Sequence, residues 1–129
     1  MPYEVVFDED DHIVTVLISG PATREEHCEA IDHAARLCTE QECNKLLINL
    51  RNLKTQGIAT LLDCFEFGIK LAKGAIQKEV YIAYVLPTDE ISIRDVKFTF
   101  MVAANRGRLA AEFTTQEEAR QWLLPKTGK

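Results

Sequence analysis

The chain has 129 residues, of which 47% are apolar and 27% are charged. This length fits a single domain, and the composition excludes a disordered, collagen-like or coiled-coil chain. The net charge of −5 argues against a general nucleic-acid binder, so we expect no nucleic-acid partner. The charge is uneven, because residues 1–43 carry a net −9 and residues 44–129 a net +4. Either the second part faces an anionic partner or both parts are simply solvated.

The start of the chain and the cysteines indicate a cytoplasmic protein. The first residues are acidic and resemble no secretory signal, and no segment approaches the ~18 consecutive apolar residues of a membrane span. The cysteines form no CxxC pair and lie in or beside apolar segments, which predicts reduced, packed thiols. They are Cys28, Cys38, Cys43 and Cys64.

The first part of the chain predicts a β-hairpin and then a helix. Residues 3–7 and 12–19 are rich in β-branched and aromatic side chains, and the acidic residues 8–11 between them form a turn. Thr23 and Glu26 have the spacing of a capping box, which starts a helix over about 24–39. The predicted buried side of this helix is Cys28, Ile31, Ala34, Ala35 and Cys38.

Strands and helices alternate through the rest of the chain. A helix begins near 88–90 and ends at a C-cap at Gly107, and the last helix has a capping box at Thr115 and Glu118. The order β-β-α-β-α-β-α-β-α predicts an α/β fold with a mixed, mostly parallel sheet of about five strands. We expect one domain over 1–125 and a flexible tail over 126–129. The remaining predicted strands are 45–50, 79–86 and 108–113, and the remaining helices are 58–74, about 88–105 and 116–124.

This order resembles the STAS family of sulfate-transporter and anti-sigma-factor-antagonist domains, and within it the small stand-alone bacterial proteins called SpoIIAA-like. The matching segments are YEVVFDEDDHIVTVLISGPAT, LLINLRNLKTQG and AANRGRLAAEFTTQEEARQWL. The resemblance covers nearly the whole chain and implies a non-catalytic regulatory module that binds a protein partner. These segments are signatures of a fold rather than of a reaction.

The loop over residues 51–57 is the first candidate site. The resemblance implies that it corresponds to the Asp-Ser-Ser-Gly loop of anti-sigma antagonists, whose first Ser is phosphorylated by a partner kinase. Lys54 stands where the family has Asp, Thr55 supplies a hydroxyl, and Gln56 and Gly57 follow. Alternatively, Thr55 caps the next helix and Gly57 eases the turn. With Arg51 nearby, the free N–H groups of that helix start favour an anion, such as a phosphate or a partner's carboxylate.

Two helices carry more apolar residues than a two-layer domain needs to bury. In helix 58–74 the additional set is Cys64, Phe67 and Leu71, and in helix 88–105 it is Ile91, Phe98, Met101 and Val102. Such sets form a surface for a homodimer or protein partner, or they line a pocket for a lipid-like ligand. In the third possibility, the helices pack on each other and on nearby loops and hide these residues.

Basic residues beside the apolar sets favour a membrane surface or lipid ligand as the alternative function. They are Lys70, Lys73, Lys78, Arg94 and Lys97. The resemblance adds to this, since SpoIIAA-like proteins are similar in outline to the lipid-binding CRAL-TRIO domains.

No catalytic, metal or cofactor pattern is present. His27 and His33 are six residues apart, which places them on different faces of a helix. The chain has no HxxxH, CxxC, HExxH, GxSxG, GxGxxG or Walker motif, so we expect no metal, no cofactor and no enzyme activity. The sequence therefore predicts a non-catalytic STAS-like binding module that acts through loop 51–57 and the two apolar helices.

Overall fold

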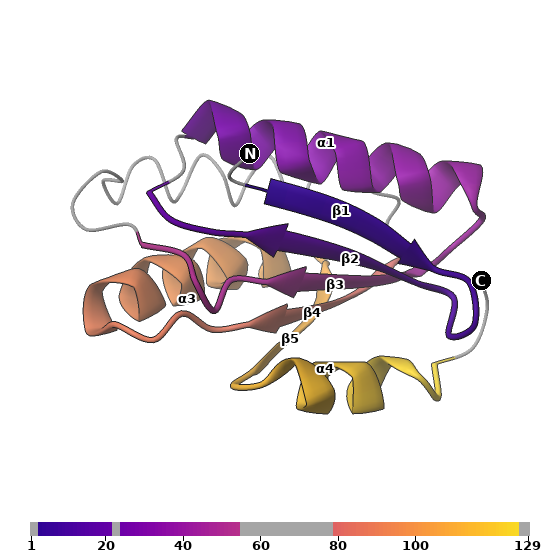
Figure 1. Cartoon of the computed structure of the whole chain (residues 1–129). Coiled ribbons are helices and arrows are strands. Elements are labelled where there is room, and N and C mark those ends of the chain that lie inside the picture. The colour runs from indigo at the N-terminus through magenta and orange to yellow at the C-terminus, as the bar shows by residue number, and fades with distance from the viewer. Residues whose placement is uncertain (1–2, 22–23, 55–78, 127–129) are drawn as a thin grey trace.

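A computed structural model describes residues 3–21, 24–54 and 79–126 (Figure 1). The described elements follow the predicted order, and the predicted helix over 58–74 lies outside the described residues. No helix in the described ranges is both long enough and apolar enough to cross a membrane. In chain order the elements are β1 (Tyr3–Asp8), β2 (Ile13–Ile18), α1 (Arg24–Glu40), β3 (Lys45–Asn49), β4 (Tyr81–Val85), α3 (Glu90–Ala104), β5 (Leu109–Phe113) and α4 (Gln116–Leu123).

The five strands form one sheet in the order β1-β2-β3-β4-β5. β1 pairs antiparallel with β2, and the other neighbours are parallel. This confirms the predicted mixed, mostly parallel sheet. At the hairpin turn, the Asp8 carboxylate accepts the N–H groups of Asp10 and Asp11 at 3.0 and 3.1 Å. An Asp that bonds the backbone two or three residues on favours a tight turn, which explains why this acidic run is a turn.

Helices cover both faces of the sheet, so the domain has three layers rather than the two assumed from the sequence. α1 and α3 share one hydrophobic core with one side of the strands, and α4 forms a second core on the other side (Figure 1). The connections through α1 and α3 each join parallel neighbouring strands, and right-handed crossovers place such helices on the same face. No described strand follows α4, and it packs on the opposite face.

The predicted buried side of α1 is confirmed at Ile31, Ala34, Ala35 and Cys38, while Cys28 is half-buried. α1 ends in a Schellman motif, in which the Cys43 N–H bonds the Cys38 carbonyl at 2.8 Å. The left-handed residue of this motif is Glu42, with φ 50°. In such motifs, a residue in the last turn of the helix often contacts the second residue after the helix end. Here the thiols of Cys38 and Cys43 make this contact.

The predicted caps of the last two helices are confirmed. The Asp89 carboxylate accepts the Ser92 N–H at 2.9 Å at the start of α3, and Gly107 has φ 99° after its end. Thr115 accepts the Glu118 N–H at 3.2 Å at the start of α4. Trp122 anchors α4, because its ring packs on Tyr81 and Phe113 and the ammonium of Lys126 lies 4.3 Å from its centroid. Residues 127–129 of the predicted tail lie outside the described residues.

Candidate functional site

The parallel strands end together at one edge of the sheet, which we call the carboxyl edge. In open α/β sheets, ligands bind in the loops beyond these strand ends. The loop after β3, the residues before α3 and the start of α4 meet here through side-chain contacts. The edge therefore gathers the described part of the predicted loop, Arg51 to Lys54.

Arg51 joins the loop to the region before α4. Its guanidinium donates to the Thr114 carbonyl at 2.7 Å, and its backbone N–H donates to the Asn49 carboxamide at 3.0 Å. The other end of that carboxamide donates to Gln116 Oε1 at 2.6 Å. Arg51 is exposed, and its contact with a carbonyl leaves its charge in place. The edge thus presents a positioned, exposed cation.

Lys54 joins the same loop to the start of α3. Its ammonium lies 3.5 Å from Asp89 Oδ1 and 3.4 Å from the Thr88 hydroxyl. The Ser92 N–H, and to a smaller degree Lys54, hold the pKa of Asp89 below its usual value. The N-cap of α3 is therefore a charged carboxylate that also forms an ion pair with the loop residue Lys54.

Six of the predicted site residues lie outside the described residues. Their roles stay predictions. Residue 55 is predicted to accept a phosphate or to cap a helix, residues 56 and 57 to complete the loop, and the other three to form the apolar set of helix 58–74. These residues are Thr55, Gln56, Gly57, Cys64, Phe67 and Leu71.

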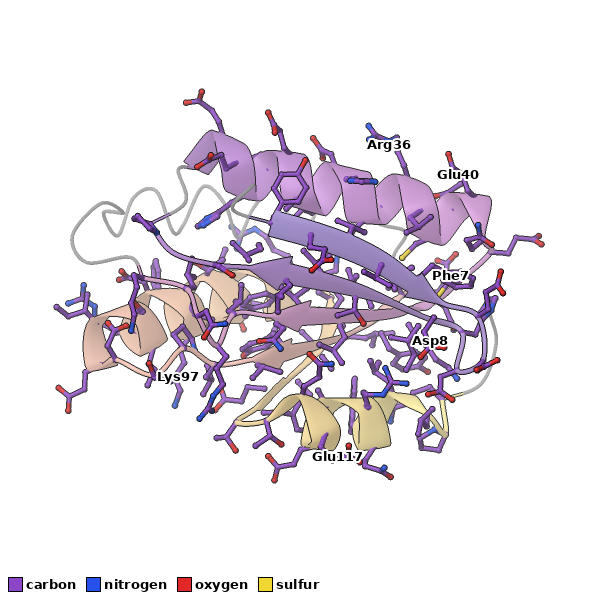
Figure 2. The ribbon with its side chains drawn as sticks, in the orientation of Figure 1. Phe7, Asp8, Arg36, Glu40, Lys97 and Glu117 are labelled. Carbon is purple, nitrogen blue, oxygen red and sulfur yellow. The ribbon has the colours of Figure 1, made fainter. Side chains whose placement is uncertain are left out.

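The outer side of α3 carries an exposed band that we call the α3 stripe. Ile91 and Met101 are 47% and 50% exposed, and Phe98 is half-buried. Arg94 and Lys97 lie between them in the sequence, with side chains 65% and 52% exposed. Lys97 is labelled in Figure 2. The predicted second apolar set is therefore exposed in part. Its fourth member, Val102, is buried and does not belong to the stripe.

The inner side of α3 is unusually polar. Ser92, Asp95 and Thr99 are at most 6% exposed. Asp95 forms an ion pair with Arg94 at 3.1 Å, and the Thr99 hydroxyl donates to the Asp95 carbonyl at 3.0 Å. These residues were not predicted to be buried, because polar residues at helical spacing usually indicate a solvated face. Their only sequence signal is that the apolar residues of this helix do not gather on one side.

A tyrosine links α3 to the edge strand β5. The Tyr84 ring stacks on Phe100 with centroids 3.9 Å apart, and its hydroxyl donates to Glu112 at 3.4 Å. Lys97 approaches the other Glu112 oxygen at 3.5 Å. Burial, with Glu112, raises the pKa of Tyr84 well above its usual value. The phenol stays protonated at neutral pH, which suits a packing role and not a catalytic base.

The thiols of Cys38 and Cys43 contact each other, and this contact shifts their pKa values in opposite directions. Contact with Cys43, together with burial, raises the pKa of Cys38, and the same contact lowers the pKa of Cys43, so Cys43 is the more readily ionised thiol of the pair. The Cys43 thiol donates to the carbonyls of His12 and Lys45 at 3.1 and 3.3 Å. Within residues 3–21, 24–54 and 79–126, no group of three or more metal-ligating side chains converges.

Comparison with known proteins identifies the fold. No protein-family profile and no curated protein matches the chain. Among solved structures, it is similar to the crystal structure of an uncharacterized protein of the DUF3478 family with a SpoIIAA-like fold, from Shewanella loihica PV-4. The two align with a TM-score of 0.52 over 94% of this chain and 91% of that chain. The fold is SpoIIAA-like.

The SpoIIAA-like fold confirms the resemblance drawn from the sequence at the level of architecture. The two proteins are 16% identical, and such a likeness establishes the fold alone. The site residues of this chain must therefore be argued from their own contacts.

Proposed function

We propose that this SpoIIAA-like chain is a non-catalytic binding module that engages a partner protein through the α3 stripe and loop 51–57. The observation that carries the proposal is the exposure of Ile91 and Met101 on one side of a helix whose buried side contains Ser92, Asp95 and Thr99. Exposed apolar side chains rimmed by charged ones are typical of protein interaction surfaces.

The loop contributes a cation and a connection to the helix. Arg51 is exposed at the carboxyl edge, and Lys54 contacts the cap of α3. A partner carboxylate or phosphate at the loop would find Arg51 already positioned by Thr114. The same anion would compete with Asp89 for Lys54, so binding at the loop is expected to be felt at the first turn of α3.

Photo-crosslinking in the native host tests this function. Benzoylphenylalanine replaces Met101 in one version of the protein and Arg36 in the other. Arg36 is exposed on the outer side of α1 and serves as the matched control (Figure 2). We expect a discrete protein adduct from position 101 that is absent from position 36 and weakens in Arg51→Ala. Identical adduct patterns from the two positions would overturn the proposal.

A second candidate function is attachment to an anionic membrane surface. The observation that favours it is the mixture of apolar and basic side chains along the α3 stripe, an arrangement found in helices at lipid interfaces. Vesicles of phosphatidylserine and phosphatidylcholine should then carry the protein upward in a flotation gradient. The double variant Ile91→Asp, Met101→Asp should stay at the bottom, whereas Leu124→Asp, a change at an exposed apolar residue elsewhere, should float. If the unmodified protein fails to float at low salt, this function is excluded.

A further inference from the structure

Among the described helices, none packs over the middle of β1 on the α4 side of the sheet. α4 packs mainly against β3, β4 and β5 (Figure 1). It covers the end of β2 at Ile13, and its Arg120 reaches Asp8 at the end of β1, whereas Val6 in the middle of β1 stays exposed. A groove of about 280 Å³ lies on this face. This is below the roughly 300–1,000 Å³ of small-molecule pockets, so it suits side chains of a docked segment better than a separate ligand. The groove is lined by Glu4, Val6, Asp8, Thr15, Leu17, Gln116 and Arg120.

The groove runs beside a free strand edge. In the described part of the chain, β1 pairs with β2 on one side and has no strand on the other. Its side chains alternate, with Tyr3, Val5 and Phe7 packed on the α1 side and the intervening residues in the groove. Val6, at the centre of the groove side, is 50% exposed. A free edge with an exposed apolar centre is a template for an added strand.

The surroundings of the groove are acidic. Its cation, Arg120, is already bonded to Asp8 and Asp11. Glu4 stands exposed at one end of the groove, and Glu9 and Asp10 are exposed in the adjoining turn. On the groove side of β1, Val6 therefore has a carboxylate two residues before it and another two residues after it.

The same charges disfavour a second copy of this chain as the occupant. In an antiparallel pairing that places Val6 opposite its counterpart, Glu4 would face the second copy's Asp8. Like charges directly opposite each other destabilise a strand pair. A segment with cations at these positions would instead form two complementary cross-strand pairs.

We propose that β1 accepts an extended, cationic segment of a partner protein by strand addition. The segment would place an apolar side chain against Val6 and a Lys or Arg opposite Glu4 and Asp8. Its remaining side chains would lie beside Tyr3, Val5 and Phe7, so they would be apolar. This surface is on the opposite face of the sheet from the α3 stripe, and the inference does not depend on the function proposed above.

Fluorescence polarisation with a synthetic probe tests the inference. The probe is the labelled peptide Gly-Lys-Val-Val-Val-Lys-Gly, and its control has Glu in place of both Lys residues. We expect the basic peptide to bind saturably at low ionic strength and the acidic one not to bind. Glu4→Lys should weaken binding about tenfold, since it replaces an attractive cross-strand pair by a repulsive one. Glu29→Lys, the same charge change on the exposed side of α1, should leave binding unchanged.

Backbone methylation separates strand addition from simple charge attraction. Successive N–H groups of a strand point to opposite edges, so methylating alternate amides of the peptide blocks one edge at a time. One of the two methylated peptides should lose binding and the other should retain it. Equal binding by both, equal weakening by Glu4→Lys and Glu29→Lys, or no binding of the unmethylated peptide at millimolar concentration would overturn the inference. An unchanged thermal unfolding transition of Glu4→Lys establishes that the variant is folded.

Discussion

α1 and α3 pack on the same face of one sheet but differ in the residues that they bury and expose (Figure 1). α1 buries small apolar side chains and exposes charged ones, among them Glu29, Arg36 and Glu40. α3 also buries apolar residues, among them Val96 and Phe100. In addition it buries the polar residues Ser92, Asp95 and Thr99, and it exposes Ile91 and Met101.

The difference between the two helices lies in how much of their apolar surface is buried in the core. A helix stabilises a domain by burying its apolar side, and α1 follows that rule. α3 keeps part of its apolar surface in water, which forgoes stabilisation from burial. Exposed apolar side chains beside charged ones are typical of interaction surfaces. The comparison therefore supports a structural role for α1 and is consistent with the partner contact proposed for α3, and each prediction below tests one of these roles.

The largest expected effect comes from making the same substitution in the two helices. Ile31→Ala removes a side chain that is 4% exposed, and we expect it to destabilise the domain by about 3 kcal/mol. Ile91→Ala removes one that is 47% exposed, and its effect should stay below about 0.5 kcal/mol. Urea unfolding measures this difference in stability, and the comparison requires that both variants unfold with equal slopes. A loss above about 1.5 kcal/mol for Ile91→Ala would mean that the stripe is covered in solution.

The next effect concerns the one strained residue at the end of α1. Glu42 has φ 50°, a conformation that disfavours residues with a Cβ atom and suits glycine. Glu42→Gly should stabilise the domain by about 0.5–1 kcal/mol. The control is Glu40→Gly, within the last turn of the helix, which should destabilise it. If both changes destabilise, a native contact of the Glu42 side chain outweighs the backbone strain.

Local patterns predicted most of the fold. Turn-forming acids, two caps, and alternating strands and helices were sufficient for the element order, because these signals depend on neighbouring residues. The face covered by α4 was not predictable. The handedness of a crossover predicts which face of the sheet is covered by a helix that connects two parallel strands. No described strand follows α4, so this rule does not apply to it. The open groove beside β1 follows from this placement and was missed for the same reason.

The candidate site was predicted only in part, since it depends on contacts between distant segments. The sequence shows that Arg51 and Lys54 follow an inner strand. The contact of Lys54 with Asp89 arises because β3 and β4 are parallel neighbours in the sheet, which brings the segments that follow them together. Ile91 and Val102 lie about 20° apart around α3 at 100° per residue. Packing exposes one and buries the other, and no periodicity separates them.

A smaller effect is expected from the buried polar side of α3. The Thr99 hydroxyl donates to the Asp95 carbonyl one turn earlier, a bond that adds little to a helix. Thr99→Val keeps the side-chain shape, so stability should change by less than about 0.5 kcal/mol in thermal or urea unfolding. A loss above about 1.5 kcal/mol would show that the hydroxyl belongs to a buried network. The buried polar residues of α3 would then stabilise the domain, as the buried apolar residues of α1 do.

The smallest effect is a pH dependence at the start of α3. The Ser92 N–H and Lys54 hold the pKa of Asp89 below its ordinary value of 3.8. A carboxyl whose pKa is lower when folded adds stability that is complete above its unfolded pKa and is lost as the pH falls through the folded one. Asp89→Asn keeps an acceptor for the cap but cannot titrate. The thermal midpoint of the native protein should therefore exceed that of Asp89→Asn near pH 6, and the gap should close as the pH falls through the folded pKa of Asp89.

The control for this titration is Glu90→Gln, which removes the same charge from the same turn without altering the cap. The gap between the native protein and Glu90→Gln measures the effect of removing a charge from this turn while the Asp89 cap is intact. Adding Lys54→Met should shrink the Asp89→Asn gap, because part of the lowered pKa comes from that ammonium. If Lys54→Met leaves the gap unchanged, the loop and α3 are not coupled through this ion pair. Binding at loop 51–57 would then have to reach the α3 stripe by another route.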